Sequence, residues 1–139
     1  DLGCIDFPAW EETLRVNTLG PVRVTRAFLE PVSRSPRRLV VAISSHMGSI
    51  AEIGLPGSYA YRSSKAALNA AMKGISLELR PRGIGVLLLH PGWVRTRMGG
   101  PDAPLSPEES VAAMRALIEG FDLTMSGRFF RYNGTEIPW

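Results

Sequence analysis

Tyr61 and Lys65 are the residues whose types and spacing point most directly to chemistry. They lie four positions apart in the run YRSSK, which places both side chains on one face of a helix. A free tyrosine phenol ionises at about pH 10, and a neighbouring ammonium favours the phenolate form. The pair could therefore act as a general acid or base. As an alternative, two neighbours on the surface of any helix would show the same spacing.

Ser45 is a second candidate, because it stands at the end of an aliphatic run. A hydroxyl there could donate to a substrate oxygen that gains negative charge. The alternative is a serine that caps a turn, which is the commoner role of serines in loops. A serine hydrolase is disfavoured, since the chain has no G-x-S-x-G motif and no carboxylate placed to orient His46 or His90. Two histidines and one cysteine also disfavour a metal site.

Asn17 becomes a candidate through its distance from Pro21. A proline inside a helix has no N–H and clashes with the carbonyl four residues earlier, which is that of Asn17. That carbonyl must find another partner, such as a water molecule in a polar relay. A simple packing bend would produce the same pattern.

Two short aliphatic runs predict strands of a parallel sheet. They cover residues 39–44 (LVVAIS) and 84–90 (IGVLLLH), and neither alternates with polar residues, as is typical of strands buried on both faces. Residues 61–80 lie between them, are rich in alanine and leucine, and end before Pro81 and Gly83, so they predict a helix. Strand, helix and strand form a right-handed βαβ unit.

Three further elements complete a predicted α-β-α-β-α-β order. Residues 8–31 predict a helix that is interrupted at residues 20–21. Residues 106–120 begin with a capping box and predict another helix. Residues 127–134 predict a last strand at an edge of the sheet. The predicted fold class is therefore α/β, with a doubly wound parallel sheet between helices.

Polar residues follow both predicted strands, at the edge where open α/β sheets bind ligands. Residues 44–46 follow the first strand, and the run PGWVRT, residues 91–96, follows the second. A loop then leads into the helix that carries Tyr61. Because independent elements converge there, we expect the functional site at this edge.

Composition narrows the function classes. The chain has 139 residues, 45% of them hydrophobic and 21% charged, which predicts one globular domain. No aliphatic run approaches the roughly 18 residues of a membrane helix, and no signal peptide is evident, so we expect no membrane association. A single cysteine favours a reducing, cytoplasmic compartment. The short cluster Arg34, Arg37 and Arg38 is more typical of a solvated loop than of nucleic-acid binding.

Four motifs resemble the short-chain dehydrogenases/reductases in order and approximate spacing. They are RVNTLGP with Asn17, AISSHMG with Ser45, YRSSK with Tyr61 and Lys65, and PGWVRT. The resemblance spans essentially the whole chain. Within the family, the runs SSHMGSI, YAYRSSKAALN, HPGWVRTRMGGP and GRFFRYNGTEIPW are most similar to the C-factor branch, which is named for a bacterial intercellular signalling protein.

The resemblance implies an NAD(P)-dependent interconversion of alcohol and carbonyl compounds. Tyr61 would exchange the hydroxyl proton, Lys65 would favour its phenolate and bind the nicotinamide ribose, and Ser45 would hold the substrate oxygen. Asn17 would anchor a water in the proton relay, with Trp93 as a pocket wall. The residues implied to bind the cofactor, either NAD or NADP, are Tyr61, Lys65, Pro91, Gly92, Val94 and Thr96.

The family's Gly-rich cofactor motif, its cofactor selector and its NNAG segment are absent from the sequence. The resemblance therefore implies that residues 1–139 form a single, partial Rossmann-like domain, the catalytic C-terminal half of such an enzyme. We expect this half to be incompetent alone. We also expect the strand over residues 39–44 to present an unpaired edge.

Two functions remain open from the sequence. The first is a reductase that acts on a small carbonyl or alcohol substrate. The second is a non-enzymatic, C-factor-like signalling or interaction module. The helices over residues 8–31 and 61–80 resemble those of the family's dimer interface, which implies a homo-oligomer in either case.

Overall fold

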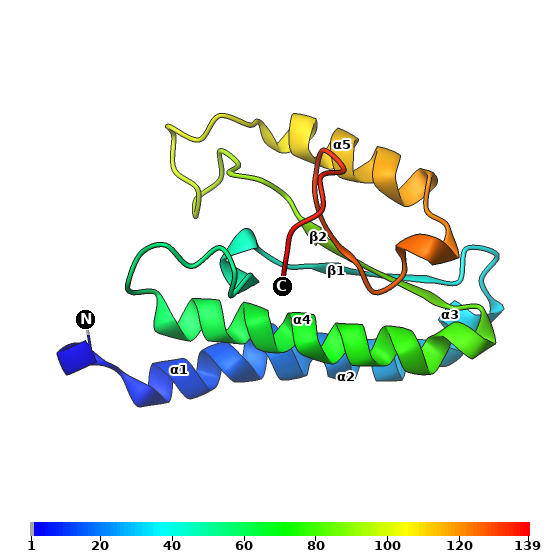
Figure 1. The fold of residues 1–139 in the computed structure, drawn as a ribbon, viewed down its shortest axis with the longest axis horizontal. Helices are drawn as coiled ribbons and strands as arrows, with labels where there is room; N and C mark the ends of the chain where they lie inside the picture. Colours follow the sequence, from blue (N-terminus) through cyan, green and yellow to red (C-terminus); the bar gives the residue numbers. More distant parts are fainter. Residues whose placement is uncertain (1) are drawn as a thin grey trace.

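The computed structural model describes residues 2–139 and shows a three-stranded parallel sheet between two layers of helices (Figure 1). The sheet order is β1-β2-β3, with β1 Leu39–Ile43, β2 Gly85–His90 and β3 Phe129–Arg131. The helices are α1 Phe7–Leu14, α2 Gly20–Ala27, α3 Leu29–Arg34, α4 Tyr59–Leu79 and α5 Pro107–Glu119. This arrangement confirms the predicted α/β class. Among residues 2–139, no helix combines the length and apolar character needed to cross a bilayer.

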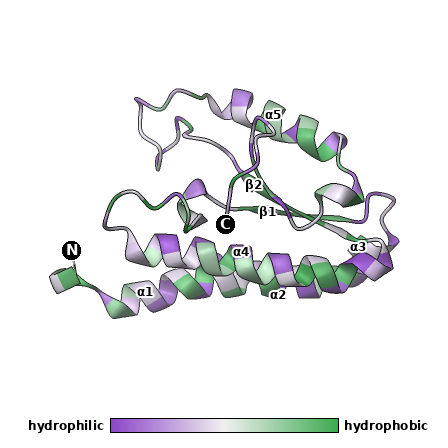
Figure 2. Ribbon diagram, in the orientation of Figure 1, coloured by the Kyte–Doolittle hydropathy of each residue, from purple (hydrophilic) through white to green (hydrophobic). Residues whose placement is uncertain are grey.

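Strand β2 is the centre of the core because both of its faces are covered. Val86 and Leu88 pack with Leu68 and Met72 of α4 on one face. Leu87 and Leu89 face α5 on the other. All four β2 side chains are fully buried, which explains why this run is continuously apolar rather than alternating. Figure 2 shows the apolar strands between helices of mixed hydropathy.

Helices α1 and α2 run beside α4 on one face of the sheet (Figure 1). The interruption predicted at residues 20–21 instead lies one turn earlier, in a π-helical turn over Arg15–Leu19. Its hydrogen bonds skip one extra residue, since the N–H of Gly20 donates to the carbonyl of Arg15. Pro21 then stands in the first turn of α2, where its missing N–H is tolerated. A second break at Phe28 separates α2 from α3.

The C-terminal part follows the predicted order closely. Helix α5 begins with the capping box, in which the Ser106 hydroxyl accepts from the Glu109 N–H and the Glu109 carboxylate accepts from the Ser106 N–H. Strand β3 occupies three residues at the edge of the sheet, and the chain then turns at Gly134 so that Glu136 pairs with Phe130. Within the described residues, β1 pairs with β2 alone.

Candidate active site

The candidate site lies beyond the carboxyl ends of β1 and β2. Ser45 follows β1, the turn over residues 91–96 follows β2, and the first turn of α4 carries Tyr61. Two cavities of about 650 and 670 Å³ open there, and Tyr61 lines both. The elements therefore converge on one edge, as the sequence predicts.

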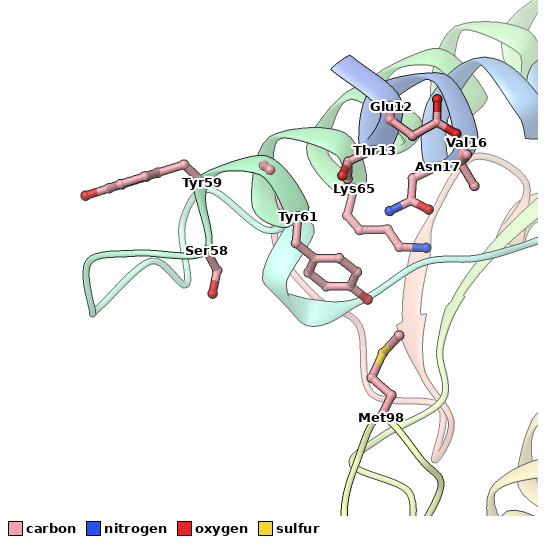
Figure 3. A pocket seen from close by; sticks show the side chains of 10 residues that line it. Glu12, Thr13, Val16, Asn17, Ser58, Tyr59, Tyr61, Lys65 and Met98 are labelled. Carbon is pink, nitrogen blue, oxygen red and sulfur yellow. The ribbon is translucent and has the colours of Figure 1, made fainter. Parts of the chain in front are cut away.

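Tyr61 and Lys65 both line the first cavity and lie side by side, whereas the ring of Tyr59, at another part of the cavity wall, is directed away from them (Figure 3). The Nζ atom of Lys65 lies 5.8 Å from the centre of the Tyr61 ring and donates a hydrogen bond to the carbonyl of Ile43 at 3.2 Å. Burial lowers the pKa of Lys65. The amine is thus held between the end of β1 and the phenol, where its charged form can stabilise a phenolate.

Asn17 reaches the first cavity from the π-helical turn (Figure 3). Its side-chain amide donates to the hydroxyl of Ser64 at 3.1 Å, and that hydroxyl donates to the Tyr61 carbonyl at 2.8 Å. The Thr18 hydroxyl donates to the Ser64 carbonyl at 2.8 Å. The π-helical turn is therefore attached to α4 one residue before Lys65.

Ser45 is buried at the entrance to a short 3₁₀ turn, and its hydroxyl oxygen accepts from the Met47 N–H at 3.2 Å. The capping role is therefore present, but it uses a lone pair and leaves the hydroxyl proton free to be donated. Gly48 closes this turn against α4, and a Cβ there would lie 2.9 Å from the carbonyl carbon of Lys65. A side chain at this position would push the Ser45 turn away from Lys65. No signal in the sequence predicts this role of Gly48, although the glycine closes the motif SSHMG.

The turn after β2 is held by its own side chains. The Trp93 indole N–H donates to the Gly99 carbonyl at 2.7 Å, and the Arg95 guanidinium donates to the carbonyls of Ala103 and Pro104, each at 2.9 Å. The second cavity is lined by Pro91, Gly92, Trp93, Val94 and Thr96, together with Ser45 and Tyr61. The structure thus brings the predicted cofactor-facing turn and two of the four candidate catalytic residues to one cavity.

Met98 is a site residue that sequence reasoning missed. It lies in the loop after the turn, is 86% exposed, and lines both cavities opposite Tyr61 (Figure 3). No local motif marks it, because its position depends on how Arg95 holds the loop.

His46 and His90 form a pair that the sequence could not reveal. They follow different strands, yet Nδ1 of His46 lies 3.2 Å from Nε2 of His90 at the wall of the second cavity. No group of three or more histidine, cysteine or acidic side chains in residues 2–139 is arranged to hold a metal ion.

Comparisons with known proteins, by sequence and by structure, agree with one another. The short chain dehydrogenase family model matches residues 4–104. C-signal of Myxococcus xanthus is 49% identical over 138 residues, which cover 99% of this chain and 83% of that protein. The carbonyl reductase Sniffer of D. melanogaster matches with a TM-score of 0.96 at 33% identity, over 100% of this chain and 60% of that chain. The NADPH-bound carbonyl reductase from chicken fatty liver matches with a TM-score of 0.92 at 30% identity, over 100% and 60%.

The chain spans about three fifths of the length of these two reductases. The similarity to C-signal confirms the predicted likeness to the C-factor branch. The matched residues 4–104 contain all four sequence motifs singled out above, and the fold agrees with that of the reductases over the whole chain. The chain therefore belongs to the short chain dehydrogenase family.

Proposed function

We propose that this chain is the catalytic part of an NAD(P)-dependent reductase that interconverts small alcohols and carbonyl compounds. The observation that carries the proposal is that Tyr61 lies between two cavities, with Lys65 in one and Ser45 in the other. A substrate oxygen near Tyr61 would thus be within reach of an acid, a cation and a second donor. Similarity to carbonyl reductases supports the same reaction class.

The donor set of this site suits the ribose and nicotinamide end of NAD or NADP. The Lys65 ammonium has three N–H groups, of which one serves the Ile43 carbonyl, so two can bind ribose hydroxyls. The turn over residues 91–96 would face the nicotinamide in the second cavity, with the Thr96 hydroxyl and the Val94 backbone near its carboxamide. The bound cofactor supplies or accepts the hydride, and with it two electrons.

The roles of the chain's own residues follow from their chemistry. Tyr61 donates its hydroxyl proton to the carbonyl oxygen as the carbonyl carbon is reduced, so that the alcohol and a phenolate result. The Lys65 ammonium stabilises this phenolate, and the Ser45 hydroxyl donates to the substrate oxygen while charge builds there. A water held by Asn17 would then pass a proton from solvent to the Tyr61 phenolate. The reverse sequence oxidises the alcohol.

The test is the exchange of Tyr61 for phenylalanine, with Tyr59→Phe as the matched control because the ring of Tyr59 is directed away from Tyr61 and Lys65 (Figure 3). Tyr61→Phe should lower carbonyl reduction at least ~100-fold, as expected for loss of a general acid, whereas Tyr59→Phe should retain activity. Fluorescence titration with NADH and NADPH checks that both variants bind cofactor. Equal and measurable carbonyl reduction by the two variants would rule the proposal out. We expect turnover to require the part of a reductase that these residues do not span.

A second candidate is a non-enzymatic signalling or interaction module in the cytoplasm, which the similarity to C-signal favours. A homo-oligomer through α1–α2 and α4 would suit either function, since Val24 of α2, Leu77 of α4 and Phe28, which directly follows α2, are exposed apolar side chains. For the module, Tyr61→Phe should leave partner binding unchanged. Micromolar binding of NADH or NADPH by the 139-residue chain would exclude a purely non-enzymatic role.

A further inference from the structure

His46 and His90 form a pair that the proposed proton chemistry does not use. The Nδ1 atom of His46 lies 3.2 Å from Nε2 of His90, with ring centres 4.7 Å apart and ring planes inclined by 61°. His46 is exposed and lines the second cavity beside Ser45 and Tyr61. His90 stands at the end of β2, with its Nδ1 buried and without a hydrogen-bond partner among the described residues.

His90 is neutral at ordinary pH. Burial, reinforced by His46 and by Arg131, lowers the pKa of His90 to about 4, while Glu52 opposes this shift. Arg131 and Glu52 are themselves paired at 2.6 Å, so each largely offsets the other's charge. A neutral imidazole carries a proton on only one of its two nitrogens.

The surroundings of His90 decide which nitrogen carries that proton. A proton on Nδ1 would bury an N–H without an acceptor, which is rare and costly in folded proteins. A proton on Nε2 instead points at Nδ1 of His46, which can accept it. His90 is therefore the Nε2–H tautomer and donates to His46.

This hydrogen bond also determines the state of His46. Its Nδ1 accepts from His90, so its own proton resides on Nε2, the nitrogen on the far side of the ring. Because His46 is exposed and lines the second cavity, this N–H is available to a ligand there. The described residues that line this cavity include no aspartate or glutamate, so a substrate carboxylate would meet no opposing charge.

We propose that His46 determines substrate specificity by donating its Nε2–H to a second oxygen of the substrate. This oxygen is additional to the carbonyl oxygen, to which Tyr61 and Ser45 donate. The preferred substrates are then carbonyl compounds with a neighbouring carbonyl or carboxylate, such as 1,2-diketones and 2-oxo acids. His90 is the positioning residue that orients this donor. The proposal rests on the proposed reductase function.

The test uses the protein as its source cells produce it and compares a 2-oxo acid with the monoketone of the same chain length. His46→Phe keeps a ring but removes the donor, and should lower kcat/KM for the 2-oxo acid about tenfold, mainly through KM, while leaving the monoketone unchanged. His46→Gln restores an N–H donor and should recover part of the loss. An equal loss on both substrates would show that His46 is only structural and would overturn the proposal.

Nitrogen-15 NMR of the imidazoles tests the hydrogen-bond argument independently of turnover. We expect the Nε2–H tautomer for His90, and a shift of the His46 Nε2 resonance when the 2-oxo acid is added. An Nδ1–H tautomer at His90 contradicts the proposal. If the wild-type protein reduces neither substrate, the reductase function fails. Addition of the 2-oxo acid, followed by NMR, then tests the His46 proposal by itself. An unchanged His46 Nε2 resonance would overturn it.

Discussion

The side-chain amide of Asn17 donates to the hydroxyl of Ser64 at 3.1 Å, which joins the π-helical turn to the helix that carries Tyr61 and Lys65. Ser64 is fully buried and also donates to the Tyr61 carbonyl. This contact crosses 47 residues of sequence and aligns two helices at the candidate site. Ser64 therefore holds the Asn17 side chain in the position that its proposed role requires.

Replacement of Ser64 by alanine tests this support. Ser64→Ala leaves the Asn17 amide without its acceptor, so we expect a loss of about 1–2 kcal/mol in the free energy of unfolding and reduced carbonyl turnover. Ser63→Ala is the matched control, because Ser63 accepts from the Trp10 indole at 2.8 Å, away from Asn17. Chemical denaturation and steady-state kinetics should show similar instability in both variants but reduced turnover only in Ser64→Ala.

The π-helical turn can be tested at Pro21. Pro21→Ala supplies the N–H that a regular α-helix would direct to the Asn17 carbonyl, and so favours an α-helical turn in place of Arg15–Leu19. We expect an unchanged or higher Tm, since a helical hydrogen bond is added, together with a roughly tenfold loss of turnover from displacement of Asn17. Calorimetry and kinetics measure the two effects. Full retention of turnover would show that the π-helical turn is only a packing feature.

We expect Lys65 to lower the free energy of unfolding although it is required for carbonyl turnover. Burial lowers the pKa of Lys65 from its ordinary 10.5, so the charged form is disfavoured in the folded protein at neutral pH. Lys65→Met removes the cation that stabilises the Tyr61 phenolate, so it should abolish turnover. Because it also removes a charge that burial disfavours, Tm should be unchanged or raised. The stability difference between variant and wild type should shrink as the pH rises towards 10.5, because the folded protein releases this proton before the unfolded chain does. A clear loss of stability at pH 7 would contradict this expectation.

Acid should destabilise the protein through His90. Its pKa is about 4 in the folded protein against 6.5 ordinarily, so the unfolded chain binds the proton first as the pH falls. The free energy of unfolding should therefore decrease between pH 6.5 and 4 and not at higher pH, by ~1–2 kcal/mol for a partly exposed group. Denaturation of the wild type and of His90→Gln across this range measures the effect. Parallel pH profiles for the two proteins would exclude His90 as the cause.

Much of the fold is predictable from local pattern. The strands at residues 39–43 and 85–90 lie within one residue of their predicted bounds, because continuous aliphatic runs are characteristic of strands buried on both faces. The capping box at Ser106 was also confirmed, since its signal lies within four residues. The predicted break in the N-terminal helix, at residues 20–21, is one turn too late, because the effect of Pro21 falls on the turn before it.

The sequence by itself determined the α/β class, the order of elements and the identities of Asn17, Ser45, Tyr61 and Lys65 as candidates, since these depend on residue type and short-range spacing. Only the tertiary structure decided which distant side chains meet. The contacts between Asn17 and Ser64 and between His46 and His90 join residues from different elements, and the position of Met98 depends on how its loop packs. Such contacts leave no periodic signal, because they arise from how helices and strands pack against one another in space.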